Sequence, residues 1–501
     1  MTSLIPSELI WNRFDLTSKE YPASVAVRTP QAALTFAELS SGAIQLSEWL
    51  RDRISSRALV AHSLSNSISF APAFLGLCRN NAIIPMLSPK YRESEVRAII
   101  ASLPIEHILT SPSQAAMLAK IIDLREGSVV TCDGACEQLA LVSIDRTKFP
   151  PTDIDRALLA QAAIIKLTSG STGVPKGVVL TAKNVLASSK IVCDTLGLNT
   201  GDHIVCPVPL FHSYGFDLGL LPVLTAGATL VPSDLFVPRI LLRELADPRT
   251  KVFLGVPSMY QALVDAAGIV PDLSHIKYLL SCTAPLNPSL IQAFREKFGL
   301  SICQHYGSSE TGGATIHDPS QVAAHEHAVG RAMSGVTIAL VNKSGQHVPA
   351  GDDGEVVVSS DAVSPGYIIG APSDRQVLTG GKYHTSDLGH LSPDGFLTLK
   401  GRIDQLVNIG GLKVSPLEVQ QVLELHPSVR EVAVLGIRDA QGSETLVAVV
   451  SLKTLESESV LLEHCRRLLA EYKVPRRITI MADLPRGGTG KIQIRCEDLQ
   501  V

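Results

Sequence analysis

The chain has 501 residues, of which 45% are hydrophobic and 18% are charged, and its formal net charge at pH 7 is -4. This length suggests about three domains with a large buried core. The weakly negative charge provides no basic surface, which argues against a nucleic-acid partner.

Targeting signals and membrane spans are not evident in the sequence. Residues 1–16 lack the charged, apolar and small-residue regions of a secretory signal, and the last residues carry no peroxisomal address. The most apolar stretch, 218–231, is too short to span a bilayer and contains Gly219, Pro222 and Gly227. Nine cysteines are scattered without histidines at zinc-site spacing. We therefore expect a cytoplasmic protein with reduced thiols and no stable membrane insertion.

Residues 1–160 alternate helical and strand patterns. The periodicity predicts helices over 36–51, 69–79 and 94–102, and short buried strands over 58–63 and 82–87. Strand–helix–strand order predicts a parallel, doubly wound α/β sheet. Nothing in this part calls for chemistry, and we interpret it as scaffold.

Residues 161–330 repeat this style and form a second α/β subdomain. The patterns predict a helix over 185–196 and strands over 162–167, 202–207, 228–231, 252–256, 278–281 and 300–303. The strands 228–231, 252–256 and 278–281 are each followed by a proline and then a helical stretch. Residues 331–402 have short alternating strands such as 355–359 and 396–399, which indicate a β-barrel-like subdomain. Residues 1–402 would thus make a large N-terminal domain.

The sequence pattern of residues 403–501 predicts a small, mobile α+β C-terminal domain. Its expected elements are helices over 417–425 and 460–471 and strands over 429–435 and 446–452. No low-complexity linker precedes it, so a tight joint rather than a long tether connects it to the rest.

The stretch 162–180 carries the clearest chemical signal. An apolar run ends in a loop of glycines and hydroxyl residues, followed by Pro175, Lys176 and Gly177. Glycines let backbone N–H groups converge on an anion, hydroxyls add donors and a lysine adds positive charge, so the loop suits a polyphosphate. The Walker spacing is missing, because Gly177 rather than a hydroxyl residue follows the lysine. A flexible Gly/Ser surface loop has the same composition.

The whole string TSGSTGVPKG resembles the phosphate loop of the adenylate-forming superfamily: acyl- and aryl-CoA synthetases, luciferase and the adenylation domains of peptide synthetases. The resemblance extends from Phe14 onward, because six further segments recur in the family's order. It implies that ATP is bound by the residues Thr168, Ser169, Gly170, Ser171, Thr172, Gly173 and Lys176. Among these, it gives Thr172 a catalytic role.

Two of these segments match the family's nucleotide contacts. In Tyr306-Gly307-Ser308-Ser309-Glu310-Thr311, the resemblance implies that Tyr306 and Gly307 lie near adenine, Thr311 contacts the α-phosphate and Glu310 holds Mg²⁺ together with Thr172. Standing alone, this segment would be an ordinary turn with an exposed glutamate. An aspartate that accepts two hydrogen bonds can hold a ribose diol, and the resemblance gives Asp387 that role with Arg402 as its partner.

Two segments of the C-terminal part match the family's moving lobe. Asp404 resembles the hinge about which this domain rotates between two half-reactions, although Gln405 and Asn408 replace the family's usual acid and lysine. The glycine-rich loop Leu484–Ile492 contains Lys491, which the resemblance implies is the catalytic lysine of adenylation. Its ammonium would neutralise charge that grows on the α-phosphorus. Outside the resemblance, both residues are ordinary surface charges.

The remaining segments match the acyl side of the site. His212 resembles an aromatic gate near the carboxylate, although a packed histidine at a strand end is a serious alternative. The expected pocket comprises His212, Ser213, Tyr214, Asp217, Val256 and Thr283. Asp217 resembles the peptide-synthetase residue that pairs with an amino group, but a carboxylate in an apolar pocket is costly without a cation. A residue near a helix start is the alternative that we favour.

One further segment and a glycine-containing stretch near residue 410 complete the resemblance. The segment Ser281-Cys282-Thr283-Ala284-Pro285-Leu286 departs from the family's usual S-G-A-A-P-L. The resemblance implies that Ala284 and Pro285 contact adenine, and Cys282 and Thr283 add side chains next to these contacts. Asn408–Pro416, with Gly410 and Gly411, looks more like acyl-CoA synthetases than peptide synthetases, which favours CoA.

The expected function is therefore ATP-dependent activation of a carboxylic acid to an acyl-AMP, followed by transfer to a thiol. The expected cofactors are ATP, Mg²⁺ and CoA. Two alternatives stay open: a free-standing enzyme that loads an amino or acyl group onto a separate carrier protein, and a nucleotide binder without turnover. The sequence does not name the acid, its pathway or the oligomeric state.

Overall fold

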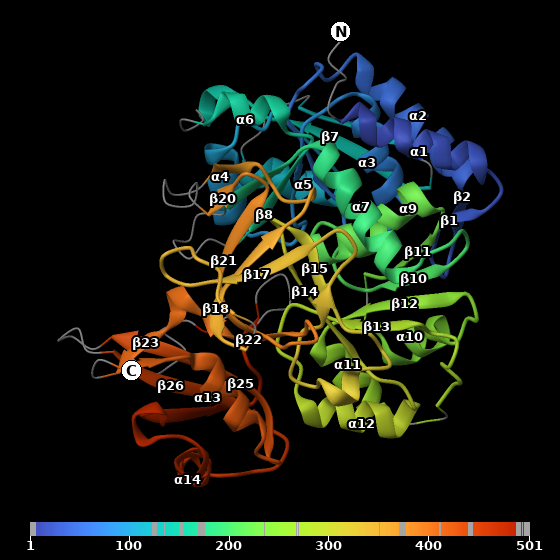
Figure 1. Ribbon diagram of the computed structural model, residues 1–501. Helices are drawn as coiled ribbons and strands as arrows, with labels where there is room; N and C mark the ends of the chain where they lie inside the picture. The colour runs from blue at the N-terminus through green and yellow to red at the C-terminus, as the bar shows by residue number, and fades with distance from the viewer. Residues whose placement is uncertain are drawn as a thin grey trace.

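The computed structural model gives the backbone and side chains of most of the chain. The described residues are 7–122, 128–134, 136–149, 154–168, 176–234, 236–266, 268, 270–349, 351–369, 377–409, 412–438, 444–486, 492 and 494. Figure 1 shows two large sheets with their helices, a smaller β-rich unit beside them, and the C-terminal elements gathered at one end of the molecule.

An eight-stranded sheet is formed within the described residues, in the order β19-β9-β8-β4-β3-β5-β7-β6. Its strands are β3 (Val60–Ser63), β4 (Ile84–Met86), β5 (His107–Thr110), β6 (Val129–Asp133), β7 (Gln138–Ser143), β8 (Ile164–Thr168), β9 (Lys176–Leu180) and β19 (Gly366–Ile369). The strands β3, β4, β5 and β8 are parallel, whereas β6, β7, β9 and β19 join by antiparallel pairing at the two sides. Both faces are covered, as parallel strands require.

A nine-stranded sheet lies beside the first, in the order β16-β15-β14-β13-β12-β10-β11-β1-β2. Its strands are β1 (Val25–Arg28), β2 (Ala33–Thr35), β10 (His203–Cys206), β11 (Thr229–Pro232), β12 (Thr250–Gly255), β13 (Tyr278–Ser281), β14 (Cys303–Ser308), β15 (Gly312–Ile316) and β16 (Arg331–Ala332). The inner strands from β1 to β14 are parallel. These two sheets confirm the expected α/β class.

Helices cover the two sheets. Those associated with the first are α3 (Phe70–Arg79), α4 (Glu93–Ser102), α5 (Pro112–Ile121) and α6 (Arg156–Gln161). The others are α1 (Glu8–Glu20), α2 (Phe36–Arg51), α7 (Ala182–Leu196), α8 (Ser213–Gly215), the π-helix η2 (Phe216–Leu220), α9 (Leu221–Ala226), α10 (Pro238–Leu245), α11 (Pro257–Asp265) and α12 (Pro288–Phe298). Proline at the first turn of α10, α11 and α12 suits a helix start, where its missing N–H is not needed.

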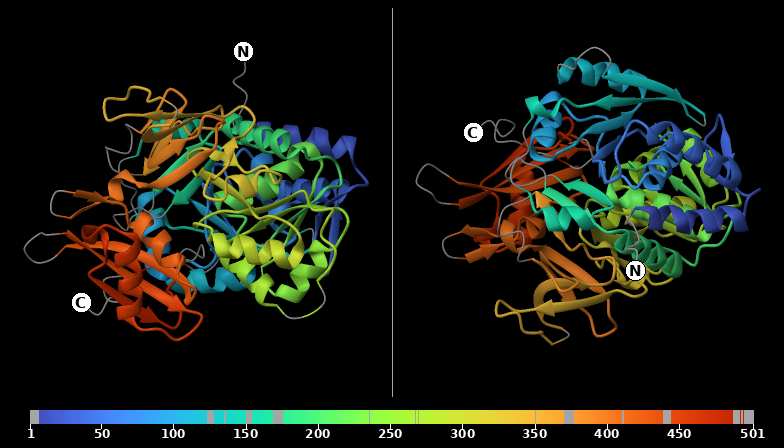
Figure 2. Two further views of the ribbon diagram at one scale, coloured as in Figure 1. Left: turned by 60° about the horizontal axis from the view of Figure 1, so that its bottom comes forward. Right: turned by 90° about the horizontal axis from the view of Figure 1, so that it is seen from above.

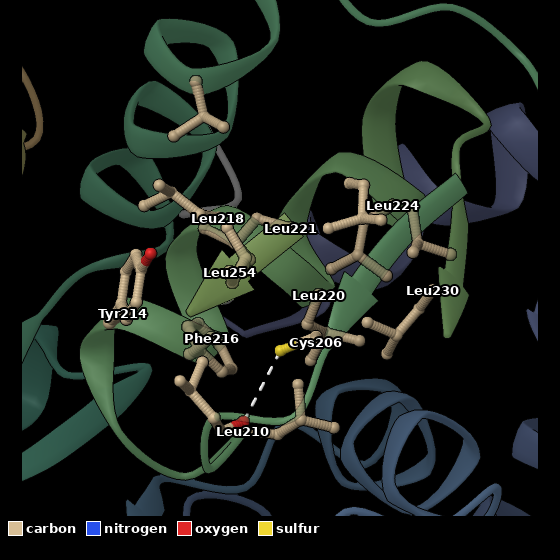
Figure 3. Close-up of a cluster of buried hydrophobic side chains, with 14 of the residues drawn as sticks. Cys206, Leu210, Tyr214, Phe216, Leu218, Leu220, Leu221, Leu224, Leu230 and Leu254 are labelled. Carbon is tan, nitrogen blue, oxygen red and sulfur yellow. Dashed lines mark hydrogen bonds between the residues drawn. The ribbon is translucent and has the colours of Figure 1, made fainter. Parts of the chain in front are cut away.

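The largest core lies between the two sheets and the helices α1, α2, α3 and α7. The helical run from Ser213 to Ala226 is embedded in it: Tyr214, Phe216, Leu218, Leu220, Leu221 and Leu224 pack against side chains of β10, β11 and β12 (Figure 3). A second core fills the opposite face of the eight-stranded sheet, against α4 and α5. Because strand side chains alternate, Ile164 faces the first core and Ile165 the second.

The β-rich unit and the C-terminal part follow. A five-stranded sheet comprises β17 (Thr337–Val341), β18 (Asp353–Ser359), β20 (Leu378–Thr379), β21 (Lys382–Leu391) and β22 (Leu397–Arg402). Beyond it lie the pair β23 (Val407–Ile409) and β24 (Leu412–Val414), the helices α13 (Pro416–Glu424) and α14 (Glu458–Leu468), and a sheet of β25 (Val429–Arg438), β26 (Glu444–Leu452) and β27 (Arg477–Met481). This part has its own core and lies to one side in all views (Figure 2).

One expected strand is displaced. The sequence predicted a strand at 300–303, whereas the structure has β14 at Cys303–Ser308. Leu300 and Ile302 are apolar, but they and Ser301 precede the strand and are not paired in the sheet. The paired residues of β14 include polar residues, which a search for hydrophobic periodicity does not identify. Within the described residues, no helix is long and apolar enough to cross a membrane.

Candidate active site

The β8–β9 hairpin carries the predicted phosphate loop. Thr168 at the end of β8 pairs with Lys176 at the start of β9. The predicted residues Ser169, Gly170, Ser171, Thr172 and Gly173 lie outside the described residues. The pairing nevertheless fixes the position of both ends of the loop relative to the sheet.

The β14–β15 hairpin brings Tyr306, Gly307, Glu310 and Thr311 together, with the turn between Ser308 and Gly312. Glu310 is buried and its Oε1 accepts a hydrogen bond of 2.7 Å from the hydroxyl of Tyr367. The Thr311 hydroxyl oxygen accepts from the Ser308 N–H at 3.2 Å, which closes the turn.

The β21–β22 hairpin places Asp387 opposite Arg402. The Tyr306 hydroxyl donates to Asp387 Oδ2 at 2.5 Å, and Arg402 Nη1 lies 3.7 Å from Asp387 Oδ1. Burial raises the pKa of Asp387 above its ordinary value, while Tyr306 and Arg402 act in the opposite direction. The structure therefore brings the predicted adenine-side tyrosine and the predicted ribose carboxylate into direct contact.

A pair of tyrosines connects these hairpins. The hydroxyl of Tyr367 on β19 donates to Glu310 Oε1, and the Lys176 ammonium lies 5.5 Å from the centroid of the Tyr367 ring. Tyr383 on β21 is a neighbour of Tyr367 and contributes to raising its pKa. Burial, followed by the neighbouring Glu310 charge, raises the pKa of Tyr367. Tyr367, on β19 at one edge of the eight-stranded sheet, thus has neighbours from three hairpins: Lys176, Glu310 and Tyr383.

Arg402 also holds the predicted hinge residue. Its Nε and Nη2 atoms donate to the two carboxylate oxygens of Asp404 at 2.9 and 3.0 Å. This pairing lowers the pKa of Asp404. Asp404 lies in a short 3-10 turn, Ile403–Gln405, between the β-rich unit and the C-terminal part.

The predicted acyl-side segment contacts the β14–β15 turn. The Ser213 and Ser309 hydroxyls lie 2.8 Å apart, and half-buried His212 caps the short helix α8 by accepting from the Tyr214 N–H at 3.5 Å. The Tyr214 hydroxyl donates to the Leu280 carbonyl at 3.0 Å, so this side chain is fixed in the core. Ser213 therefore contacts the turn that carries Glu310.

Asp217 is paired inside the protein. Lys166 on β8 donates to its Oδ1 at 2.8 Å and its Oδ2 at 2.7 Å, and each of the two side chains is 3% exposed. Burial raises the pKa of Asp217, and the Lys166 charge opposes this shift. Asp217 lies in the π-helix four residues after Ser213, rather than at the start of the helical run.

The adenine-side segment follows β13. Gly255 of β12 pairs with Ser281 of β13, so Val256 and Cys282 leave neighbouring strand ends. Thr283 adopts the left-handed conformation with φ +76°, a region that a β-branched residue rarely occupies. Ala284 and Pro285 are exposed.

The predicted residues Lys491, Gly410 and Gly411 lie outside the described residues. Their described neighbours are paired: Ile409 with Leu412, and Arg486 with Ile492.

Comparison with known proteins identifies the family. The sequence pattern of the AMP-binding enzymes matches residues 14–368, and that of the AMP-binding enzyme C-terminal domain matches residues 418–491. The chain belongs to the AMP-binding enzymes. It is accordingly an AMP-forming ligase.

Relatives agree with this assignment, and solved structures share the fold. Over 87% of both chains, this AMP-binding enzyme is 29% identical to an oxalate–CoA ligase of Arabidopsis thaliana. It is 28% identical to a medium-chain fatty-acid–CoA ligase of Escherichia coli, over 95% of this chain and 88% of that one. The o-succinylbenzoate CoA synthetase of Bacillus subtilis, solved with its acyl-adenylate, shares the fold with a TM-score of 0.80 at 23% identity over 96% of each chain. An amide bond synthetase of Marinactinospora thermotolerans superimposes with a TM-score of 0.82 at 24% identity over 99% of each chain.

The sequence analysis did not single out three residues that lie beside the predicted site residues of this AMP-binding enzyme: Lys166, Tyr367 and Tyr383. A lysine inside an otherwise apolar strand was the available signal for Lys166, since a buried charge requires a partner. Tyr367 follows Pro365 and Gly366, but neither this position nor Tyr383 distinguishes a site tyrosine from a packed one. Their contacts depend on pairing between strands far apart in the chain.

Proposed function

We propose that this AMP-binding enzyme activates a carboxylic acid in two half-reactions. In the first, a carboxylate oxygen of the acid attacks the α-phosphorus of ATP, an acyl-AMP forms, and pyrophosphate leaves with the electron pair of the broken P–O bond. In the second, the sulfur of CoA attacks the acyl carbon, its proton passes to solvent and AMP leaves. The acid is already ionised at neutral pH, so the first step needs no general base.

The convergence of three hairpins is the observation that supports this proposal most directly. Tyr367 lies between Lys176 at the end of the phosphate loop and the buried Glu310, and Tyr306 joins the β14–β15 hairpin to the Asp387–Arg402 pair. Phosphates at the loop, ribose hydroxyls at Asp387 and adenine along Tyr306 would place one nucleotide across all three. Holding the acid and the α-phosphorus in line would then supply much of the rate enhancement.

The residues present fit a magnesium ion. Glu310 offers a carboxylate on the same turn as Ser308 and Thr311, whose hydroxyls lie 3.2 Å apart. Mg²⁺ is commonly held by one or two carboxylates together with substrate phosphates and water. Glu310, with Thr172 of the loop, would hold it. When bound, the ion supplies positive charge to the phosphate oxygens.

The C-terminal part would supply the second charge. Lys491 would approach the α-phosphate during adenylation, and residues 403–501 would then rotate about Asp404 for thiol transfer. The placement of Asp404 between the two parts, held by Arg402, supports this assignment.

CoA is the proposed acceptor because the named relatives that span most of the chain are CoA ligases. The alternative is transfer of an amino or acyl group to a separate carrier protein. The sequence feature that suggested an amino acid was Asp217, but both of its carboxylate oxygens accept hydrogen bonds from Lys166. We therefore propose an acid that has no amino group paired with Asp217.

Pyrophosphate exchange with a panel of acids tests the function. We expect exchange of labelled pyrophosphate into ATP with at least one plain carboxylic acid, and CoA-dependent release of AMP with the same acid. ATP binding without exchange for any acid would instead favour a non-catalytic nucleotide binder. Exchange limited to amino acids would favour the carrier-loading alternative.

A further inference from the structure

A lysine and an aspartate are buried together at a point that the proposed reaction does not use. Lys166 Nζ lies 2.8 and 2.7 Å from the two carboxylate oxygens of Asp217, and each side chain is 3% exposed. The Lys166 ammonium also lies 5.3 Å from the ring centroid of Phe216. Moving two charges out of water is costly, and well-packed apolar residues often do as well for stability. The pair therefore calls for a reason other than stability.

The first member of the pair belongs to the strand that leads into the phosphate loop. Lys166 is two residues before Thr168, and its neighbours across the sheet are Met86 on β4 and Val178 on β9. By alternation along β8 it faces the same side as Ile164, toward the core between the two large sheets. Its ammonium thus reaches from one sheet toward the other.

The second member belongs to the acyl-side helical run. Asp217 is four residues after Ser213, whose hydroxyl lies 2.8 Å from that of Ser309. The π-helix that contains Asp217 is itself an irregularity, and such turns frequently occur at functional sites. Its backbone position is therefore connected to the turn that carries Glu310.

The β14–β15 hairpin closes on the pair from a third direction. Gly312 directly follows Thr311 and has φ +66°. A Cβ atom added at Gly312 would lie 2.7 Å from Ser188 Oγ and 3.7 Å from Asp217 Oδ2. The strand start therefore packs against Ser188 and the Asp217 carboxylate with no room for a side chain.

We propose that Lys166 and Asp217 are a positioning pair for the adenylation half-reaction. They fix the end of β8, and hence the start of the phosphate loop, relative to Glu310 and to the acyl-side segment around Ser213. Two charge-assisted hydrogen bonds define direction and distance, whereas apolar contacts permit sliding. Displacement of a reacting group by about 1 Å costs roughly a hundredfold in rate. This inference rests on the proposed function.

The test replaces the pair without emptying the core. The double variant Lys166→Met, Asp217→Leu removes both charges and keeps side chains that fill the space, so we expect a folded enzyme with a thermal midpoint within a few degrees of the wild type. Pyrophosphate exchange should fall about 10- to 100-fold in kcat. The dissociation constant of ATP, measured by calorimetry, should change by less than about threefold, because the nucleotide contacts themselves remain.

Two further variants separate positioning from general effects of charge removal. The double variant Lys190→Met, Asp194→Leu removes an exposed ion pair on α7, in which Lys190 Nζ lies 2.5 Å from Asp194 Oδ2. This variant should leave the rate of pyrophosphate exchange unchanged. Arg28→Met breaks a half-buried pair with Glu244 at 2.5 Å, and it should lower the thermal midpoint without changing kcat.

Results that would overturn the positioning role differ from those that would contradict the proposed function. Unchanged kcat in the double variant would overturn the proposal, and so would a joint loss of midpoint, ATP affinity and kcat, which would assign the pair to folding alone. Absence of exchange in the wild type with every acid would contradict the proposed function instead.

Discussion

Thr283 shows how a single residue can store strain beside a site. Its φ of +76° places a β-branched side chain in the left-handed region, at a cost of about 1–3 kcal/mol. It occupies the segment to which the adenine contacts of Ala284 and Pro285 are assigned, and it stands where the family pattern has a small residue.

Replacing Thr283 by glycine should relieve this strain. Glycine adopts positive φ without steric cost, but it also gives the unfolded chain more conformational freedom. The two effects together should raise the free energy of unfolding of Thr283→Gly by about 1 kcal/mol. Thr283→Ala keeps a Cβ atom and is the matched control, which should gain less. Calorimetric thermal midpoints measure the difference. A glycine variant less stable than the alanine variant would contradict the strain assignment.

Sequence motifs select several polar groups of the candidate site but do not say how they pair. Tyr306, Asp387 and Arg402 contact one another, and Glu310 accepts a hydrogen bond from Tyr367. Motifs report residue identity, whereas the partners come from other strands, which is why the bond from Tyr367 to Glu310 was not foreseen. Lys166 was missed because its strand otherwise resembles an ordinary buried one.

At the scale of elements, the predicted start of helix α2 coincides with its cap, whereas α7 and α14 begin two or three residues before their predicted starts. Helix α2 begins at Phe36 as expected, because Thr35 Oγ1 accepts from the Glu38 N–H at 3.2 Å and Glu38 accepts from the Thr35 N–H at 2.8 Å. Strand β14 was displaced because its pairing, rather than its hydrophobicity, determines its extent. The π-helix η2 has no local sequence signal, since it depends on packing within the core (Figure 3).

Removing the cap of α2 should lower the free energy of unfolding and leave the activity unchanged. Thr35→Ala loses the oxygen that accepts from Glu38, and such changes cost about 1 kcal/mol. Thr35→Ser keeps the oxygen and should lie within a few tenths of a kcal/mol of the wild type. Urea unfolding measures both variants, and pyrophosphate exchange should be unchanged. An alanine variant as stable as the serine variant would show that the cap is not needed.

At the scale of the whole molecule, the two large sheets meet around a core that also buries titratable groups. His62, His203 and His305 are each buried, and burial lowers their pKa to about 4 from an ordinary value of 6.5. The native state therefore keeps these imidazoles neutral at pH values where the unfolded chain protonates them. Burial raises the pKa of Glu424 to about 7 and also raises those of Asp217 and Asp387, and these shifts act in the opposite sense. The lowered pKa of Asp404, held by Arg402, acts in the same sense as the histidines.

These shifts predict loss of stability in mild acid. The histidine contributions are fully present above pH 6.5 and decline as the pH falls toward 4, by up to about 1.4 kcal/mol per pH unit for each group. We expect thermal midpoints that fall steadily from pH 7.5 through 6.0 to 5.0. A midpoint that stays level or rises over this range would show that these side chains are accessible to protons in the native state.

The central claim of the proposed function concerns the C-terminal part: its cation, Lys491, assists the first half-reaction alone. Lys491→Ala should lower acyl-AMP formation by about 100-fold or more, because charge on the α-phosphorus loses its partner. The same variant should convert chemically supplied acyl-AMP to acyl-CoA at nearly the wild-type rate. Measuring both half-reactions on one preparation tests this directly: selective loss of the first is the predicted result, and equal loss of both would contradict it.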